Sequence, residues 1–213
     1  MLQYAVIAGP NGAGKSTLSA RLSKNNAIIF DPDIAKFKIE KQYPDISDDA
    51  VQAAVTRAYY DTELRALGGQ KHLTVETNLK NEFLGERALA FKESGYRTCL
   101  IFMMLPDVLS SMARVNQRVY QKGHFVDAEN IKQNFRYSLE NLVKVASNFD
   151  EVMLVCAASE YGIISTPEPL LIVRDGVVIL TNENTPDWAR SVVENVVGVL
   201  AGRGRDTSTG LHR

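Results

Sequence analysis

The sequence predicts an α/β fold in which a mostly parallel sheet is flanked by helices. Three observations predict it: apolar runs of strand length alternate with segments of helical period, a glycine-rich turn separates the first strand from the first helix, and an Asp-Gly turn joins two apolar runs near the C-terminus. The 213 residues, 45% of them hydrophobic, suffice for one domain with a substantial core, expected at residues 1–201.

Five apolar runs have the length and composition of strands, and a long connecting helix is expected from Asp48 to Leu67, where the apolar spacing is helical and two glycines end the run. The predicted strands are Tyr4–Ala8, Ala27–Phe30, Leu73–Val75, Thr98–Met104 and Val152–Ala157. Their alternation with helices is typical of βαβ units and a parallel sheet.

The C-terminal part predicts a hairpin and a last helix. Asp175-Gly176 is a two-residue hairpin turn, and Thr185 with Pro186 predicts the N-cap and first residue of the helix. Residues 202–213 are rich in Gly, Arg, Ser and Thr, so they are expected to form a disordered tail.

Charge and composition argue against several classes of protein. Lys and Arg total 24 and Asp and Glu total 25, so a formal charge of -1 offers no overall attraction to nucleic acid or to an anionic membrane. No apolar run approaches the roughly 20 residues of a membrane span and no leader is evident, which predicts a cytoplasmic protein. Cys99 and Cys156 lie in apolar runs and are expected to be buried thiols.

Residues 8–17, AGPNGAGKST, contain the pattern G-x-x-x-x-G-K-[ST] between a predicted strand and a predicted helix. Such a loop turns successive backbone N–H groups toward phosphate oxygens at a helix N-terminus, while the lysine reaches the β- and γ-phosphates and the serine holds Mg²⁺. ATP and Mg²⁺ are therefore the predicted cofactors, with Ser16 as the metal ligand. The predicted nucleotide-binding residues are Gly9, Pro10, Asn11, Gly12, Ala13, Gly14, Lys15, Ser16 and Thr17.

A loop of this kind fits a transporter motor and a small-molecule kinase equally well. A motor requires a later signature sequence and an apolar strand that ends in Asp-Glu. The LGGQ at Leu67–Gln70 resembles part of that signature, but it ends a helix and no such strand follows. The sequence therefore favours a kinase.

A carboxylate for the second substrate follows the strand Ala27–Phe30, where Asp31 and Asp33 stand at the carboxyl end. Phosphoryl transfer needs a group that orients the attacking hydroxyl and accepts its proton, and Asp33 is expected to do so. The alternative is an Asp-Pro turn in which Asp33 only caps the next helix.

The strand Leu73–Val75 is followed by Glu76, Thr77 and Asn78, a carboxylate, a hydroxyl and an amide that suit a polyhydroxylated or amide-bearing acceptor. They are expected to bind this substrate. The alternative is that Thr77 and Asn78 cap the following helix.

Residues of about 110–145 predict a lid of two helices. Arg114, Arg118 and Lys122 share one face of the first helix, Gly123-His124 breaks it, and the second helix carries Arg136 beside its buried side. These arginines would bring positive charge to the transferring phosphoryl group, although a solvated basic stripe has the same spacing. The expected apolar faces comprise Leu109, Met112, Val115 and Val119 in the first helix, and Ile131, Phe135, Leu139 and Leu142 in the second.

The order GPNGAGKST, D-P-D, E-T-N-L, R-V-x-x-R-V-x-x-x-G-H-x-V and I-x-x-x-F-x-x-S-L-x-N-L resembles the zeta toxin family of P-loop kinases over residues 6–142, in particular its stand-alone branch once labelled as ABC-type ATPases. The resemblance implies Mg-ATP-dependent phosphorylation of the sugar 3′-hydroxyl of UDP-N-acetylglucosamine. It implies Lys15 and Ser16 as ligands of the nucleotide and Mg²⁺, Asp33 as the base, and Glu76 with Thr77 as sugar contacts. Arg114, Arg118 and Arg136 would clamp the phosphate.

The chain departs from the family pattern where arginines are common, since it has Gln133, Asn134 and Tyr137 there, and Lys122 precedes Gly123-His124 in place of a glycine. His124 is expected to cap a helix. Two further hypotheses stay open: a toxin module whose main partner is an antitoxin protein, and an ATP-binding switch with no sugar acceptor.

Overall fold

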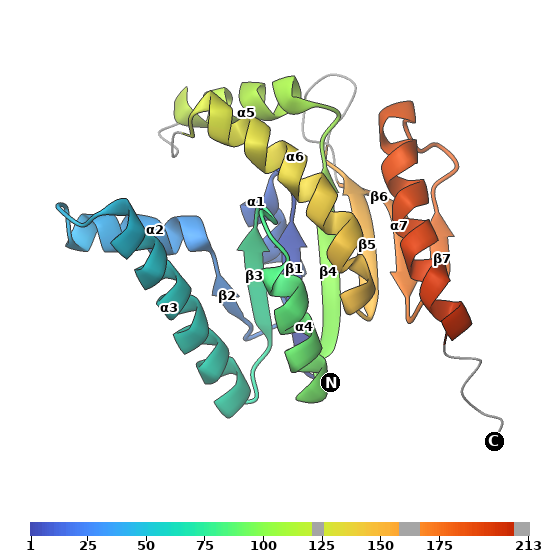
Figure 1. Ribbon diagram of the computed structural model, residues 1–213, viewed down its shortest axis with the longest axis horizontal. Coiled ribbons are helices and arrows are strands. Elements are labelled where there is room, and N and C mark those ends of the chain that lie inside the picture. The colour runs from blue at the N-terminus through green and yellow to red at the C-terminus, as the bar shows by residue number, and fades with distance from the viewer. Residues whose placement is uncertain (121–125, 158–166, 207–213) are drawn as a thin grey trace.

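The computed structural model describes residues 1–120, 126–157 and 167–206, and within them it has a seven-stranded sheet in the order β2-β3-β1-β4-β5-β6-β7 (Figure 1). Strands β1 to β5 pair in parallel, and β6 and β7 add an antiparallel edge. The α/β prediction is confirmed. The strands are β1 Gln3–Ala8, β2 Ile28–Phe30, β3 Leu73–Thr77, β4 Arg97–Met104, β5 Glu151–Cys156, β6 Glu168–Arg174 and β7 Val177–Thr181.

Helices cover both faces of the sheet unequally. Helices α3, α4, α6 and α7 contribute to the large core on one face, whereas α1 covers the other face beside β1 and β3 (Figure 1). The helices are α1 Lys15–Leu22, α2 Pro32–Gln42, α3 Asp48–Gly68, α4 Phe83–Glu93, α5 Val108–Tyr120, α6 Ala128–Val145 and α7 Asp187–Asp206, with a 3-10 turn η1 at Ala146–Asn148.

The alternation of side chains along β1 divides the core into two parts. Tyr4, Val6 and Ala8 belong to the larger cluster, and Ala5 and Ile7 to the smaller one on the opposite face. A strand buried on both faces reads as a continuous apolar run, as this one does, because neither face meets water. The phosphate loop therefore starts from the rigid centre of the sheet.

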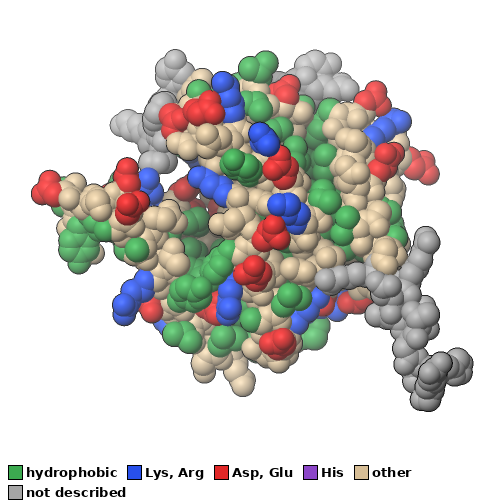
Figure 2. All heavy atoms as spheres, viewed as in Figure 1, with side chains coloured by type: hydrophobic (Ala, Val, Ile, Leu, Met, Phe, Trp, Pro, Cys, Tyr) green, Lys and Arg blue, Asp and Glu red, His purple; other side chains and the backbone are tan. Residues whose placement is uncertain are grey.

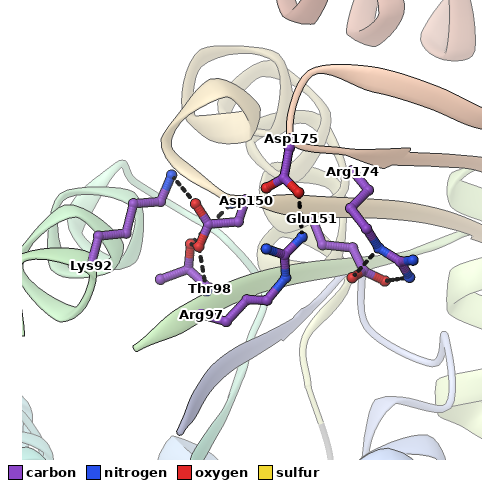
Figure 3. Close-up of polar contacts among 7 residues, drawn as sticks. All are labelled: Lys92, Arg97, Thr98, Asp150, Glu151, Arg174 and Asp175. Carbon is purple, nitrogen blue, oxygen red and sulfur yellow. Dashed lines mark hydrogen bonds and ion pairs between the residues drawn. The ribbon is translucent and has the colours of Figure 1, made fainter. Parts of the chain in front are cut away.

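The predicted hairpin forms the edge of the sheet opposite β2. Asp175 (φ 50°) and Gly176 (φ 76°) both have positive φ, as a type I′ turn requires. Figure 3 shows Asp175 paired with Arg97 of β4 (2.9 Å) and Arg174 paired with Glu151 of β5 (3.1 Å). These ion pairs tie the turn to the amino-terminal ends of the central strands.

The C-terminal helix differs from its prediction at both ends. It begins at Asp187, and the Thr185 hydroxyl donates to the carbonyl of Asn182 (2.6 Å), so Thr185 belongs to the preceding turn. The helix continues to Asp206, so the expectation of disorder from residue 202 is wrong for residues 202–206. Residues 207–213 lie outside the described part of the chain.

The buried-thiol prediction holds for Cys99, whereas Cys156 is partly exposed. Among the described residues, no helix combines the length and the apolar character that a membrane crossing demands.

Candidate functional site

A polar pocket lies where the carboxyl ends of β1, β2 and β3 meet, which is the edge at which open α/β sheets place their ligands. Figure 2 shows this side of the molecule hollowed between the projecting α2–α3 part and the body under α5 and α6. The pocket is lined by Asn11, Gly12, Lys15, Ser16, Asp31, Pro32, Asp33, Glu76, Thr77, Asn78 and Arg118.

The phosphate loop curls through three glycines with positive φ, Gly9 (141°), Gly12 (77°) and Gly14 (87°). A Cβ at Gly9 would lie 2.4 Å from the carbonyl oxygen of Met103, and a Cβ at Gly12 would lie 2.9 Å from the Cβ of Arg114. Positive φ and close neighbours together require glycine there. The sequence motif allows any residue at position 12, so it is the packing of α5 against the loop that requires glycine there.

Lys15 folds back over its own loop. Its Nζ donates to the carbonyls of Gly9 (2.9 Å) and Pro10 (3.0 Å) and to Oδ1 of Asn78 (2.7 Å). Burial lowers the pKa of Lys15 to about 8, although nearby carboxylates, Asp33 first among them, act in the opposite direction. Asn78 thus holds the lysine in the described arrangement, a role that its position in the sequence did not predict.

Ser16 and Ser19 both donate to the carboxylate of Glu76, at 2.7 Å and 2.5 Å. Burial raises the pKa of Glu76, and the two hydroxyl donors partly offset this effect. Glu76 is part of β3 rather than of the loop after it, and it pairs in register with Ile7. Its carboxylate therefore lies against the phosphate-loop helix α1.

Asp31, not Asp33, is the N-cap of α2. Its Oδ1 accepts from the backbone N–H of Asp33 (2.8 Å) and of Ile34 (3.3 Å), with Pro32 at the first helical position. The alternative in which Asp33 caps the helix is therefore wrong. Asp33 lines the same pocket as Lys15 and Ser16.

Thr77 and Asn78 do not cap α4. The Thr77 Oγ1 accepts from the N–H of Leu79 (2.9 Å), and α4 begins only at Phe83, whose N–H is bonded by Asn81 (3.3 Å). The capping alternative is wrong for both residues. Thr77 and Asn78 both face the pocket.

The three candidate arginines lie in different places relative to the pocket. Arg118 lines the pocket, whereas Arg114 donates to the carbonyls of Gly12 (3.3 Å) and Ala157 (2.8 Å), and burial lowers its pKa. The Arg136 side chain is 74% exposed and pairs with Glu140 (2.7 Å), so the structure does not bring it to the pocket. The reason is that Arg136 lies on the solvent side of α6.

The apolar face of α6 is as predicted, with Ile131 and Leu142 buried, but the predicted burial of Leu109 on α5 is wrong, because that side chain is 74% exposed. The side chain of Val119, together with Lys122, Gly123 and His124, lies outside the described residues. Of the remaining loop positions, Ala13 is buried, Gly14 precedes α1, and Thr17 is exposed at the start of α1 and does not line the pocket.

Two site residues were missed by the sequence reasoning, Asn134 on α6 and Ser111 on α5. Both are buried and both donate to Asn11, at 2.7 Å and 2.6 Å. A polar residue in the apolar period of α6 was the available signal for Asn134, because a buried amide needs a partner.

A protein-family model described as "Zeta toxin" matches residues 3–185, and the chain belongs to this family. An uncharacterised protein of Haemophilus influenzae (strain ATCC 51907 / DSM 11121 / KW20 / Rd) is 28% identical over 130 residues, covering 61% of this chain and 88% of that protein. The resemblance to zeta toxins is confirmed.

Solved structures share the fold at low identity. A structure of the PezAT chromosomal toxin-antitoxin system of Streptococcus pneumoniae matches with a TM-score of 0.58 and 13% identity over 98% of this chain and 88% of that one. AvrRxo1-ORF1:-ORF2 with ATP matches with a TM-score of 0.56 and 13% identity, covering 95% and 76%. The chain spans only 46% of its match in the Pnkp1/Rnl/Hen1 RNA repair complex, at a TM-score of 0.56, 16% identity and 67% of its own length. The chain thus shares its α/β fold with these structures, and its phosphate loop lies in the same kind of sheet.

Proposed function

We propose that this protein transfers the γ-phosphoryl group of ATP to a hydroxyl of UDP-N-acetylglucosamine or of a related nucleotide sugar. One observation carries the proposal: Asp33, which is not needed as a helix cap, lines the same pocket as Lys15, Ser16 and Arg118. A phosphate-binding loop alone fits many functions, whereas a carboxylate and a cation beside it fit transfer to an alcohol.

In the proposed reaction the acceptor oxygen forms a bond to the γ-phosphorus, and the bond from that phosphorus to the β–γ bridging oxygen breaks. Asp33 orients the hydroxyl and takes its proton, and ADP leaves with the electron pair of the broken bond. Lys15, released from Asn78, and Arg118 stabilise the negative charge on the transferring group.

The residues beside Lys15 fit Mg²⁺, a hard cation that prefers oxygen ligands. Ser16 offers a hydroxyl oxygen, and Glu76 places a carboxylate 2.7 Å from it. Ser16 and Glu76 would hold this ion, which would supply positive charge beside the phosphates of the bound nucleotide. We therefore assign Glu76 to the metal side of the pocket, in place of the sugar contact expected from the sequence.

Thr77 is the residue that we assign to the acceptor together with Asp33. Its oxygen accepts from Leu79, which leaves its hydroxyl proton free for donation to a ligand. The acceptor would then lie between β3 and the start of α2, on the opposite side of the transferring phosphate from the loop.

The experiment is incubation with Mg-ATP and a panel of UDP-sugars, followed by mass spectrometry for an added phosphate. Asp33→Asn should lower acceptor phosphorylation by about 10²–10⁴-fold, the range typical of general base catalysis, with a much smaller effect on ATP binding. Glu40→Gln, on the same helix, is the matched control and should retain full activity, because Glu40 does not line the pocket and pairs with Lys36 (3.6 Å). Unchanged turnover in Asp33→Asn would remove this residue from the mechanism.

A toxin with an antitoxin partner is the second candidate, and the fold similarity to the PezAT toxin-antitoxin system favours it. Expression alone should then arrest growth, and co-expression of a small protein encoded beside it should relieve the arrest. ATP turnover that is indifferent to every UDP-sugar, without growth arrest, would instead indicate a nucleotide-dependent switch.

A further inference from the structure

Helices α5 and α6 both contact the phosphate loop at Asn11. The Nδ2 of Asn134, on α6, donates to Oδ1 of Asn11 (2.7 Å), and the Oγ of Ser111, on α5, donates to the Asn11 carbonyl (2.6 Å). All three residues are buried, at 4% exposure or less. Hydrogen bonds in such a place are costly to break, because water cannot replace the lost partner.

The neighbouring residue, Gly12, contacts α5 as well. Arg114 of α5 donates to its carbonyl (3.3 Å), and the Ser111 carbonyl oxygen would lie 3.1 Å from a Cβ placed at Gly12. The backbone of α5 therefore lies directly on the apex of the loop. Asn11 and Gly12 are thus fixed from outside the loop, by elements about 100 residues later in the chain.

External fixation matters because glycines give the backbone of the loop conformational freedom that binding must restrict. The loop has three glycines with positive φ, and glycine populates both signs of φ with little preference. Binding of a triphosphate by main-chain N–H groups requires them to converge on one point, and each group that must first be ordered reduces affinity. A loop held in place before the ligand arrives avoids that cost.

We propose that Asn134 and Ser111 are positioning residues for the nucleotide: through Asn11 they hold the apex of the phosphate loop in the orientation that binds the triphosphate. Neither residue lines the pocket, so their effect is indirect. The helices α5 and α6 then act as a fixed support for the loop, and α5 in addition carries Arg118 to the pocket. The proposal rests on the proposed function only in that the loop binds ATP.

Helix α6 offers a matched control for a purely structural role. Asn141, seven residues after Asn134, is 6% exposed, and its Nδ2 donates to the carbonyl of Leu79 (2.9 Å) and not to a phosphate-loop residue. Replacing either asparagine by leucine, which has a similar size, removes one buried hydrogen bond and leaves one acceptor unpaired. Asn134→Leu and Asn141→Leu should therefore lose similar amounts of stability to denaturant.

The test measures binding of a non-hydrolysable ATP analogue with Mg²⁺ by calorimetry, and amide hydrogen exchange in residues 9–14. Asn134→Leu should raise the Kd about tenfold and speed exchange in the loop, whereas Asn141→Leu should change the Kd by less than about twofold. Ser111→Ala should also raise the Kd. Its effect should add less than fully to that of Asn134→Leu, because both act on Asn11.

Equal Kd values for wild type and Asn134→Leu, or an equal rise in Asn134→Leu and Asn141→Leu, would overturn the proposal. If Asn134→Leu does not fold, Ser111→Ala carries the same test with a smaller change in volume. The assay uses no acceptor, so failure of the wild type to phosphorylate any UDP-sugar contradicts the proposed function alone. Failure of the wild type to bind the analogue overturns both.

Discussion

The ammonium group of Lys15 is largely removed from water, and its hydrogen bonds offset only part of the cost of burying its charge. Three oxygen acceptors, the carbonyls of Gly9 and Pro10 and the amide of Asn78, bind it at 2.7–3.0 Å, yet burial lowers its pKa to about 8. A polyphosphate beside this group would favour its charged form and raise the pKa again. Nucleotide binding and protonation of Lys15 are therefore linked.

This linkage predicts proton uptake when the nucleotide binds. At pH 8 about half of the Lys15 side chains are neutral before binding and charged afterwards, so each binding event should take up about half a proton. Affinity for Mg-ATP should fall as the pH rises through 8. Calorimetric titrations at pH 8 in two buffers of different ionisation enthalpy measure the uptake. In Lys15→Arg, whose side chain stays charged, the uptake should vanish, and heats that are independent of the buffer in wild type would contradict the assignment.

The sequence predicted which residues lie in the pocket better than it predicted their hydrogen-bond partners. Lys15, Ser16 and Asp33 were identified from a motif and from their place after a strand, and the structure gathers them in one pocket. The contacts of Glu76 and Asn78 with the phosphate loop depend on the pairing of β3 with β1, where Glu76 lies opposite Ile7. Local patterns identify a strand but carry no information about which strand lies beside it.

At the scale of elements, the contact between α5 and the phosphate loop allows no side chain at Gly12. Gly12→Ala would place a Cβ 2.9 Å from the Arg114 Cβ at a φ of +77°, so either α5 or the loop must move. We expect a loss of about 1–3 kcal/mol in the free energy of unfolding and weaker nucleotide binding. Urea denaturation and analogue titration measure the two effects.

Gly68, at the end of α3, is the control for that substitution. A Cβ there meets nothing within 4 Å, and its φ is ordinary for a side-chain-bearing residue. Gly68→Ala should leave nucleotide binding unchanged and keep or raise stability by up to about 1 kcal/mol. A Gly12→Ala protein as stable as Gly68→Ala, with normal binding, would show that α5 does not press on the loop.

The prediction of buried helix faces was correct for α6 and wrong for one residue of α5. The spacing of Ile131 and Leu142 on α6 gave the correct buried side, whereas the same reasoning on α5 misplaced Leu109, which is exposed. Periodicity identifies the residues that share a helix face, but it does not determine how far the neighbouring element extends along that face. It also did not predict that Asn134, Ser138 and Asn141 lie on the buried side of α6, because their burial depends on partners in other elements.

Across the whole molecule, two groups of ion pairs join elements around the sheet, and they differ in how deeply they are buried. Arg87 of α4 donates to Glu63 of α3 through Nε (2.9 Å) and through its terminal nitrogen, and the Glu63 side chain is only 5% exposed. The Arg174–Glu151 pair at the hairpin turn in Figure 3 is more open to water, since the Arg174 side chain is 51% exposed. The buried Arg87–Glu63 pair and the exposed Arg174–Glu151 pair should therefore differ in how much stability is lost when one partner is removed.

The comparison of Arg87→Leu with Arg174→Leu tests this difference. Removal of Arg87 leaves the Glu63 carboxylate buried without its cation and should cost about 3–5 kcal/mol, whereas loss of the exposed Arg174 pair should cost at most about 1 kcal/mol. Urea denaturation followed by circular dichroism measures both. The double variant Arg87→Leu/Glu63→Leu should recover much of the loss, since no uncompensated charge remains inside. Because α3 and α4 pack on the sheet away from the pocket, analogue binding by the folded fraction should be unchanged in all three proteins. If Arg87→Leu were no less stable than Arg174→Leu, the buried pair would not be the contact that holds α3 against α4.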